Sequence, residues 1–456
     1  MPEISISPSG KWLLITVHCS RPACDDELYL RDQMSGEIVS LSGPQRARYT
    51  ATFDAEEGVL LCTNRDAPRG RLVVVDPNHP ETHNWRSVVD EHPNWVMMTA
   101  RAAGKRLWVS WLDGATSHVT LHSPDGRMVA SVRWPEPGTV ESIIARGEEF
   151  YGVYQSFSLP PRVYVVPAEG LSPRVLTSSV RHDVQVSVHV SSLSAPSTGG
   201  VRVPFFLLKA TRTRTCTSLQ GVDVDGAVLL TGYGGMHVPS TPRYSPSLLV
   251  WCDAGGQGVV ANLRGGCELG EGWHQDGRRD RKENVFLDFE AVARFLIDSG
   301  RADRQRVAIH GRSNGGLLVG DAVVRNPDLF AAAACGVPLL DMLRYHLFLI
   351  ADIWTEEYGH PEDPVACEWL SRYSPYHRVE AGLRYPPVLF YTSANDSRVH
   401  PMHARKMAAR MQQEARGGPF LFRVEDEAGH GAGKPVGKMV TEEADILSFL
   451  LAHVGR

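Results

Sequence analysis

The sequence predicts two domains: an all-β domain made of repeated short strands, followed by an α/β domain with a mostly parallel sheet. Two observations lead to this prediction. Before residue 200, β-rich runs separated by Gly, Pro, Asp and Ser recur at a regular spacing. After it, apolar strand-like runs alternate with longer helical stretches, as in a sheet flanked by helices. The chain has 456 residues, which is enough for two hydrophobic cores.

The repeat of the first domain contains two consecutive strands. The first strands are expected at residues 10–15, 58–62, 104–109 and 149–153, and the second strands at residues 27–30, 71–75, 118–121 and 162–166. This spacing is typical of the four-stranded blades of a β-propeller, and its regularity disfavours a β-sandwich. About four blades fit into residues 1–178, so we expect a partial β-propeller there.

The second domain is expected over residues 179–456. Its apolar runs at residues 227–230, 248–251 and 258–262 are predicted strands, and residues 286–299 form a predicted helix. Residues 196–200, Pro-Ser-Thr-Gly-Gly, form a turn between the first strands of this region. Such an alternation predicts a mostly parallel sheet with helices on both faces.

A serine nucleophile is predicted at Ser313. It lies in Gly311-Arg312-Ser313-Asn314-Gly315, between an apolar strand at residues 306–310 and an apolar helical stretch. A G-x-S-x-G segment at a strand-to-helix turn holds the serine in a strained elbow, and the flanking glycines let strand and helix pack closely. The helix would begin at Asn314, with its unpaired N–H groups facing the place where an oxyanion forms.

Two more side chains follow at the ends of later strands. Asp396 comes after a buried run at residues 386–391, and His430 lies in a small-residue turn after a run at residues 419–424. Singly, each fits an ordinary role, as a turn-capping aspartate or a loop histidine. Together they give the chain order Ser, Asp, His, which is the order of the α/β-hydrolase fold. In that arrangement His430 takes the proton of Ser313, and Asp396 orients the imidazole.

Several segments of the second domain together resemble a known family. They are residues 231–236, 261–274, the Ser313 elbow, and residues 341–346, 353–359, 395–399 and 428–435. In this order they resemble the prolyl oligopeptidases, a family of serine peptidases with the α/β-hydrolase fold. The resemblance implies an oxyanion hole made of the Tyr233 hydroxyl and the backbone N–H of Asn314.

The same resemblance implies a substrate pocket. Trp354 matches the tryptophan that stacks on a substrate proline ring, Arg398 matches the arginine that binds a substrate carbonyl, and Tyr358 and Val399 match further pocket walls. Stacking suits proline, because its flat ring carries no N–H to recognise. The chain departs from the family pattern at Met236, where a phenylalanine is usual, and at Leu339, where a valine is usual.

A third departure lies beside the nucleophile, where Arg312 replaces the usual glycine. The resemblance implies a serine endopeptidase or oligopeptidase that cleaves short, proline-containing peptides after proline. A transpeptidase of the same family, which passes the acyl group to an amine and can close a macrocycle, stays an alternative, as does an inactive binding module built on the propeller. Cleavage after basic residues would need carboxylates in the pocket, such as Glu356 and Glu357, and an esterase is disfavoured by Trp354 and Arg398.

The blade count differs from that of the resembled family, which has seven blades and a short catalytic-domain segment before them. We therefore expect a chain that is shortened at its N-terminus. Three explanations of the low blade count stay open: a half-propeller, a propeller closed by another chain, and a truncated reading frame. An arc of four blades would expose strand edges, so self-association is expected as one way to cover it.

Composition excludes several other functions. The net charge of −5 gives no basic surface for nucleic acid, and the charged run at residues 278–282 is interpreted as a solvated loop. No apolar run is long enough for a membrane span; the early one at residues 12–17 is also unlike a signal peptide, so a cytoplasmic protein is expected. The eight cysteines are dispersed and expected to be reduced thiols. No cofactor or metal site is predicted.

Overall fold

The computed structural model describes residues 2–17, 26–42, 47–177, 186–211, 224–431 and 433–454. They divide into two compact units. The first unit comprises Met1–Asp183, Thr241–Tyr244 and Cys267–Trp273, and the second comprises Val184–Ser240, Ser245–Gly266 and His274–Arg456. The predicted domain boundary between residues 178 and 179 lies outside the described residues.

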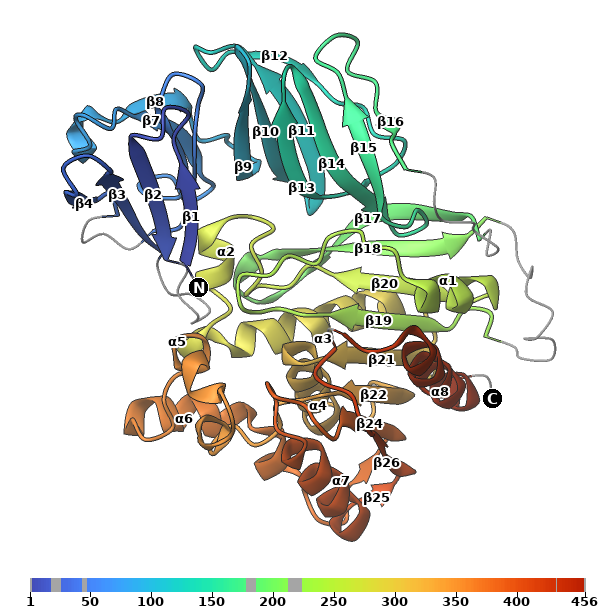
Figure 1. Ribbon diagram of the computed structural model, residues 1–456. Coiled ribbons are helices and arrows are strands. Elements are labelled where there is room, and N and C mark those ends of the chain that lie inside the picture. Colours follow the sequence, from blue (N-terminus) through green and yellow to red (C-terminus); the bar gives the residue numbers. More distant parts are fainter. Residues whose placement is uncertain are drawn as a thin grey trace. The chain divides into compact units, whose positions relative to one another are not determined.

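The first unit contains four antiparallel four-stranded sheets, each made of consecutive strands (Figure 1). Their strands are β1 Pro2–Ile6, β2 Trp12–Val17, β3 Glu27–Asp32, β4 Ile38–Ser40, β5 Tyr49–Phe53, β6 Val59–Thr63, β7 Arg71–Val75, β8 Arg86–Val89, β9 Val96–Ala103, β10 Arg106–Asp113, β11 Thr116–His122, β12 Met128–Ser131, β13 Gly138–Arg146, β14 Glu149–Ser156, β15 Arg162–Val166 and β16 Arg174–Val175. The predicted strand pairs are the second and third strands of each sheet. The expectation of about four propeller blades is therefore confirmed.

Consecutive sheets of the first unit pack face to face through their alternating side chains. In β6, Leu61 enters the core shared with sheet β1–β4, while its neighbour Leu60 enters the core shared with sheet β9–β12. In β10, Val109 faces back to sheet β5–β8 and Trp108 faces forward to sheet β13–β16. Because successive residues of a strand point to opposite faces, an inner strand that is apolar on both faces can fill two cores.

The second unit is built on one eight-stranded sheet with the order β17-β18-β20-β19-β21-β22-β24-β26. Its strands are β17 Val188–Pro196, β18 Arg202–Ala210, β19 Val228–Gly232, β20 Gln257–Ala261, β21 Val307–Arg312, β22 Ala332–Gly336, β24 Val388–Ser393 and β26 Phe420–Glu425. From β20 to β26 all neighbours are parallel, whereas β17 and β18 are antiparallel. The mostly parallel sheet predicted for this region is confirmed, and the predicted turn at residues 196–200 joins β17 to β18.

Helices cover both faces of this sheet (Figure 1). The helices after residue 240 are α1 Pro246–Asp253, α2 Glu271–Gln275, α3 Glu283–Asp298, α4 Asn314–Arg325, α5 Thr355–Tyr358, α6 Pro364–Tyr373, α7 Met402–Glu414 and α8 Val436–Val454. Helices α3, α4 and α7 bury their apolar sides in one core with inward side chains of the strands, including Leu230 and Ile309. Helices α1 and α8 pack together on the other face.

The prediction of a strand at residues 248–251 is wrong, because these residues belong to α1. The Ser245 side chain accepts a hydrogen bond from the backbone N–H of Leu248, and Pro246 stands in the first turn. Both are helix-start signals, since a serine cap satisfies a free N–H and proline needs none. A short apolar run does not by itself distinguish a buried strand from a buried helix.

Within the described ranges, the structure contains no helix that combines the length and the apolar character needed to cross a lipid bilayer.

Candidate active site

Ser313 lies at the sharp turn between β21 and α4. Its backbone has a φ of +60°, a value that is strained for any residue with a side chain. The glycines of the motif allow this turn: a Cβ on Gly311 would lie 2.1 Å from the carbonyl oxygen of Gly315, and a Cβ on Gly315 would lie 2.8 Å from that of Gly232. Any other residue at either position would push strand and helix apart. The predicted elbow is thus present, with its serine side chain only partly buried.

Asp396 and His430 are brought together although 34 residues separate them. Nδ1 of His430 donates to Oδ2 of Asp396 over 2.7 Å, while Oδ1 accepts the backbone N–H groups of Arg398 at 2.8 Å and Val399 at 2.9 Å. Burial alone would raise the pKa of Asp396, but these hydrogen bonds to its charged form bring the pKa below its ordinary value. The carboxylate is therefore held ionised, and it fixes the ring nitrogen that carries the proton.

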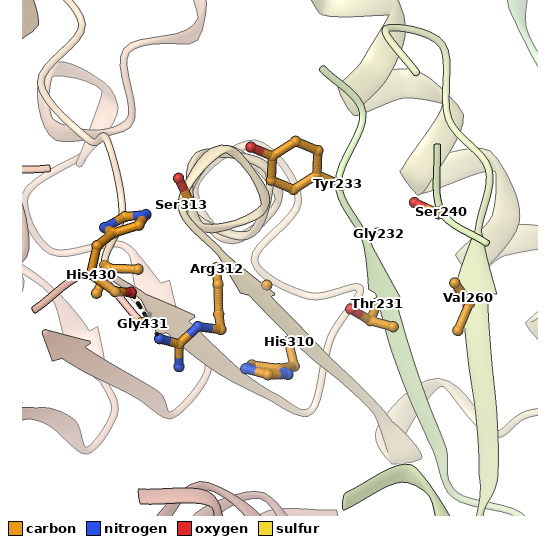
Figure 2. Close-up of a pocket in the computed structure, with 12 residues that line it drawn as sticks. Thr231, Gly232, Tyr233, Ser240, Val260, His310, Arg312, Ser313, His430 and Gly431 are labelled. Atoms are coloured by element: carbon orange, nitrogen blue, oxygen red, sulfur yellow. Dashed lines mark hydrogen bonds between the residues drawn. The ribbon is translucent and has the colours of Figure 1, made fainter. Parts of the chain in front are cut away.

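Ser313 and His430 line the same pocket, which has a volume of about 410 Å³ and is shared with Tyr233 and Arg312 (Figure 2). Among the described residues, no hydrogen bond joins His430 to Ser313. In enzymes without substrate, catalytic hydrogen bonds are often long and tighten only when substrate is bound. The imidazole of His430, the hydroxyl of Ser313 and the phenol of Tyr233 therefore line one pocket that a substrate carbonyl can enter.

The two predicted oxyanion donors face this space from different elements. Tyr233 follows β19, and burial raises the pKa of its phenol above the ordinary value, so the hydroxyl keeps its proton and can donate. Asn314 is the first residue of α4, where a backbone N–H has no partner inside the helix. The side chain of Asn314 adds a link that the sequence did not reveal: its Nδ2 donates to the backbone oxygen of Tyr233.

The predicted substrate-binding residues lie outside the lining of this pocket, but two of them contact the catalytic residues: the Tyr358 hydroxyl donates to Oδ1 of Asn314, and the backbone N–H of Val399 donates to Asp396. Trp354, Tyr358, Val399 and Leu339 are buried in the apolar core of the second unit, with Met236 packed against it. Trp354 is 4% exposed, and it ends the short 3-10 helix Ala351–Trp354, directly before α5. Arg398 is exposed and follows Asp396 by two residues. None of these six residues is among those that line the pocket in Figure 2.

Arg312, the departure beside the nucleophile, connects the turn that carries His430 to helix α8. Its guanidinium donates to Oε1 of Glu442 at 2.8 Å and to the backbone oxygen of His430 at 3.4 Å (Figure 2). Glu442 is also bound by Lys434 at 2.6 Å. Burial alone would lower the pKa of Arg312, but its surroundings, chiefly Tyr391 and Glu442, raise it, so the side chain is a fixed cation.

The interpretation of residues 278–282 as a solvated loop is wrong for two of its members. Arg278 and Lys282 are buried, the latter with a side chain that is 1% exposed, and Lys282 pairs with Glu357. The helical period could have indicated that Lys282 is buried. Lys282 directly precedes α3 and lies three residues before the buried Val285, which places both on the same side of the helix. Sequence reasoning missed this buried pair, since its partners lie 75 residues apart.

Comparison with known proteins agrees with this geometry. The sequence model described as the prolyl oligopeptidase family matches residues 242–456, and that of the prolyl oligopeptidase N-terminal β-propeller domain matches residues 1–178. The chain belongs to the prolyl oligopeptidase family. Its second unit has the α/β-hydrolase fold of that family, and its first unit is a set of propeller blades, as the sequence predicts.

Relatives cover nearly the whole of this chain. A prolyl endopeptidase of Elizabethkingia miricola is 33% identical over 97% of this chain, and a prolyl oligopeptidase of Omphalotus olearius is 30% identical over 99% of it. This chain spans 62% of the length of each of these two relatives. A solved structure from a study of two prolyl endopeptidases matches all of this chain and 66% of its own, with a TM-score of 0.91 and 33% identity.

A second solved structure shows prolyl oligopeptidase B of Galerina marginata bound to a 35mer hydrolysis and macrocyclization substrate. It matches all of this chain and 65% of its own, with a TM-score of 0.89 and 26% identity.

Proposed function

We propose that the chain carries a serine peptidase site that cleaves peptides on the carboxyl side of proline through an acyl-enzyme. The observation that carries the proposal is the strained Ser313 elbow, which shares a pocket with a histidine already oriented by an ionised aspartate. Family membership and the named prolyl endopeptidase relatives support the choice of substrate.

In the proposed first step, Oγ of Ser313 attacks the substrate carbonyl carbon while Nε2 of His430 takes the hydroxyl proton. Asp396 stabilises the imidazolium that forms, because its Oδ2 accepts from Nδ1. The Tyr233 hydroxyl and the backbone N–H of Asn314 bind the oxyanion. When the tetrahedral intermediate collapses, the C–N bond breaks and His430 returns the proton to the leaving amine. A water molecule, deprotonated by His430, then releases the acyl group from Ser313.

For substrate recognition we propose that Trp354, Tyr358, Val399, Met236 and Leu339 form the apolar wall for the proline ring, and that Arg398 binds a substrate carbonyl. Their apolar character and the exposure of Arg398 close to Asp396 support these roles. The nearby carboxylates are poor candidates for binding a basic side chain. Glu357 is committed to Lys282 and His274, and Glu356 is paired with arginines.

Transfer of the acyl group to an amine is the main alternative to hydrolysis. Both reactions use the same acyl-enzyme, and they differ only in whether water or an amine attacks it. The macrocyclization substrate named for the Galerina marginata protein supports this alternative. An inactive binding module is disfavoured, because the hydrogen bond between His430 and Asp396 and the strained turn at Ser313 are both intact.

A panel of chromogenic dipeptides with Pro, Ala, Phe or Arg at the cleaved residue tests the proposal. We expect the Pro substrate to have the highest kcat/KM, and turnover to be lost in Ser313→Ala. Mass spectrometry of the products, with and without an added amine, separates hydrolysis from acyl transfer. Equal kcat/KM for all four substrates would overturn the proline assignment, and full turnover by Ser313→Ala would overturn the nucleophile.

Two further expectations stay proposals. We propose a cytoplasmic location, which the five described cysteines fit, since all are free thiols.

We also propose self-association, for which the exposed Ile4, Ile6 and Ile38 of sheet β1–β4 offer an apolar surface. Sedimentation at several protein concentrations should show a concentration-dependent dimer, and a monomer at all concentrations would contradict it.

A further inference from the structure

We propose that the buried ion pair of Lys282 and Glu357 is a positioning device for Tyr233, which holds the phenol where it can donate to the oxyanion. The inference rests on the proposed function, in which Tyr233 is an oxyanion donor. Neither charged residue lines the pocket that contains Ser313. Both act through the backbone that follows Tyr233.

The contact with this backbone is direct. Nζ of Lys282 donates to the carbonyl oxygen of Gly234 at 2.9 Å and to Oε1 of Glu357 at 3.0 Å. The fit is tight, because a Cβ added to Gly235 would lie 2.7 Å from Nζ of Lys282 and 2.7 Å from Nδ2 of Asn314. Gly234 thus accepts a hydrogen bond from the ammonium group, and Gly235 packs against that group without space for a side chain.

Asn314 holds the same segment from the other side. Its Nδ2 donates to the carbonyl oxygen of Tyr233, and its Oδ1 accepts the hydroxyl of Tyr358 at 2.8 Å. The ammonium of Lys282 lies 5.2 Å from the centre of the Tyr358 ring. Two consecutive carbonyl groups, those of Tyr233 and Gly234, therefore have fixed donors, and this sets the direction in which the Tyr233 side chain leaves the backbone.

Glu357 makes it possible for Lys282 to be charged at this place. The side chains of Lys282 and Glu357 are 1% and 0% exposed, and an unpaired ammonium there would lose its proton instead of donating as a cation. Burial alone would raise the pKa of Glu357, but Lys282 and His274 lower it to about 2, so the carboxylate stays ionised. Its negative charge also helps to keep the nearby Tyr233 protonated.

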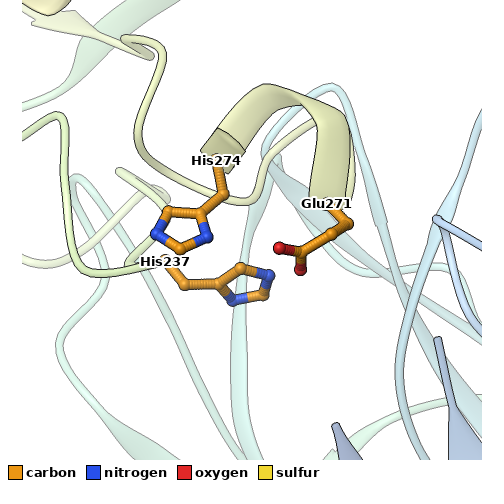
Figure 3. A group of neighbouring side chains, drawn as sticks. All are labelled: His237, Glu271 and His274. Carbon is orange, nitrogen blue, oxygen red and sulfur yellow. The ribbon is translucent and has the colours of Figure 1, made fainter. Parts of the chain in front are cut away.

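His274 binds the second carboxylate oxygen of Glu357. Its Nε2 donates to Oε2 of Glu357 at 3.1 Å, and its ring packs edge to face on that of His237, with centroids 5.1 Å apart (Figure 3). Glu271, also drawn there, belongs to the first unit. Each oxygen of Glu357 therefore accepts a hydrogen bond from a buried side chain, one from Lys282 and one from His274.

A double-mutant cycle tests the inference. The first variant, Lys282→Met with Glu357→Gln, replaces both members of the pair and so leaves neither charge buried alone. The second variant is Tyr233→Phe, and the third combines both changes. We expect the pair replacement to lower kcat by about 10- to 100-fold with little change in KM, as a misplaced catalytic group does. In the Tyr233→Phe background the same replacement should lower kcat by less than about threefold, because the donor that the pair positions is already gone.

A matched control separates positioning from general stability. Lys406 and Asp341 form another lysine–carboxylate pair of the second unit, with a fully buried carboxylate. Lys406→Met with Asp341→Asn should lower the melting temperature to a similar extent and leave kcat within about twofold of the wild type.

The possible failures are distinct. If Tyr233→Phe is as active as the wild type, the oxyanion role in the proposed function is wrong. If Tyr233→Phe is impaired but the pair replacement costs the same factor in both backgrounds, or if it leaves kcat unchanged, the positioning role of Lys282 and Glu357 is wrong while the proposed function stands.

Discussion

Replacing Asp396 by asparagine should disable the site through the histidine tautomer. In the wild type, Oδ1 of Asp396 accepts two backbone N–H groups and Oδ2 accepts Nδ1–H of His430. An asparagine has only one acceptor oxygen, and the two backbone donors will claim it. Its NH₂ group then faces Nδ1, which must become an acceptor. The ring proton moves to Nε2, and His430 can no longer take the proton of Ser313.

The expected loss follows from this geometry. The backbone N–H groups keep their acceptor in Asp396→Asn, so the fold should remain intact, although the stabilisation that the ionised carboxylate contributes is lost. The loss of a correctly oriented base lowers kcat by about 10,000-fold in a well-studied triad of this kind, equivalent to about 5 kcal/mol in the activation barrier. We expect a similar factor here, measured with a chromogenic Pro dipeptide.

Nitrogen-detected NMR of labelled histidine provides an independent measurement. It should show the neutral His430 ring protonated at Nε2 in Asp396→Asn, and at Nδ1 in the wild type. A variant that keeps kcat/KM within tenfold of the wild type, or that keeps the Nδ1–H tautomer, would refute the reasoning.

Three further predictions concern neighbouring groups. Trp354→Ala should lower kcat/KM for Pro substrates by about 1 to 3 kcal/mol more than for Ala substrates, and equal losses would show that Trp354 is no specificity wall. Arg312→Met should lower kcat/KM by about fivefold, because one hydrogen bond to the turn that carries His430 is lost. The free energy of unfolding should fall by only about 1 kcal/mol, because Glu442 keeps its bond to Lys434. A decrease in kcat/KM of more than about a hundredfold would contradict this. Because folding lowers the pKa of Asp396, its stabilisation is complete above its ordinary pKa and is lost as the pH falls through the folded value. In denaturant titrations, the difference in unfolding free energy between wild type and Asp396→Asn should shrink toward low pH, and a pH-independent difference would refute the linkage.

Local patterns in the sequence were sufficient to predict much of the fold. The strand pairs of the first unit could be found because inner blade strands are apolar on both faces and are bounded by turn residues, as at β7. The elbow could be found because close packing of strand and helix requires glycine at fixed positions, Gly311 and Gly315. Residues 248–251 were predicted to be a strand because a run of four apolar residues shows no helical period. Only the serine cap and the proline that follows it indicated a helix.

The parts of the candidate site that could not be predicted depend on contacts between distant segments. Lys282 and Glu357 pair across 75 residues, and a lysine in a charged run gives no local sign that it is buried. The second role of Asn314, through its side chain, depends on how closely α4 approaches the residue that follows β19. The contacts of Arg312 could not be inferred either, because they depend on where α8 places Glu442.

Labelling with a fluorophosphonate tests the central claim most directly, because this reagent reacts only with a serine that a neighbouring base activates. Intact mass and peptide mapping should show one adduct per wild-type chain, on Ser313, and none on Ser313→Ala. Absence of labelling in a folded wild-type chain, or undiminished labelling of Ser313→Ala, would contradict the account.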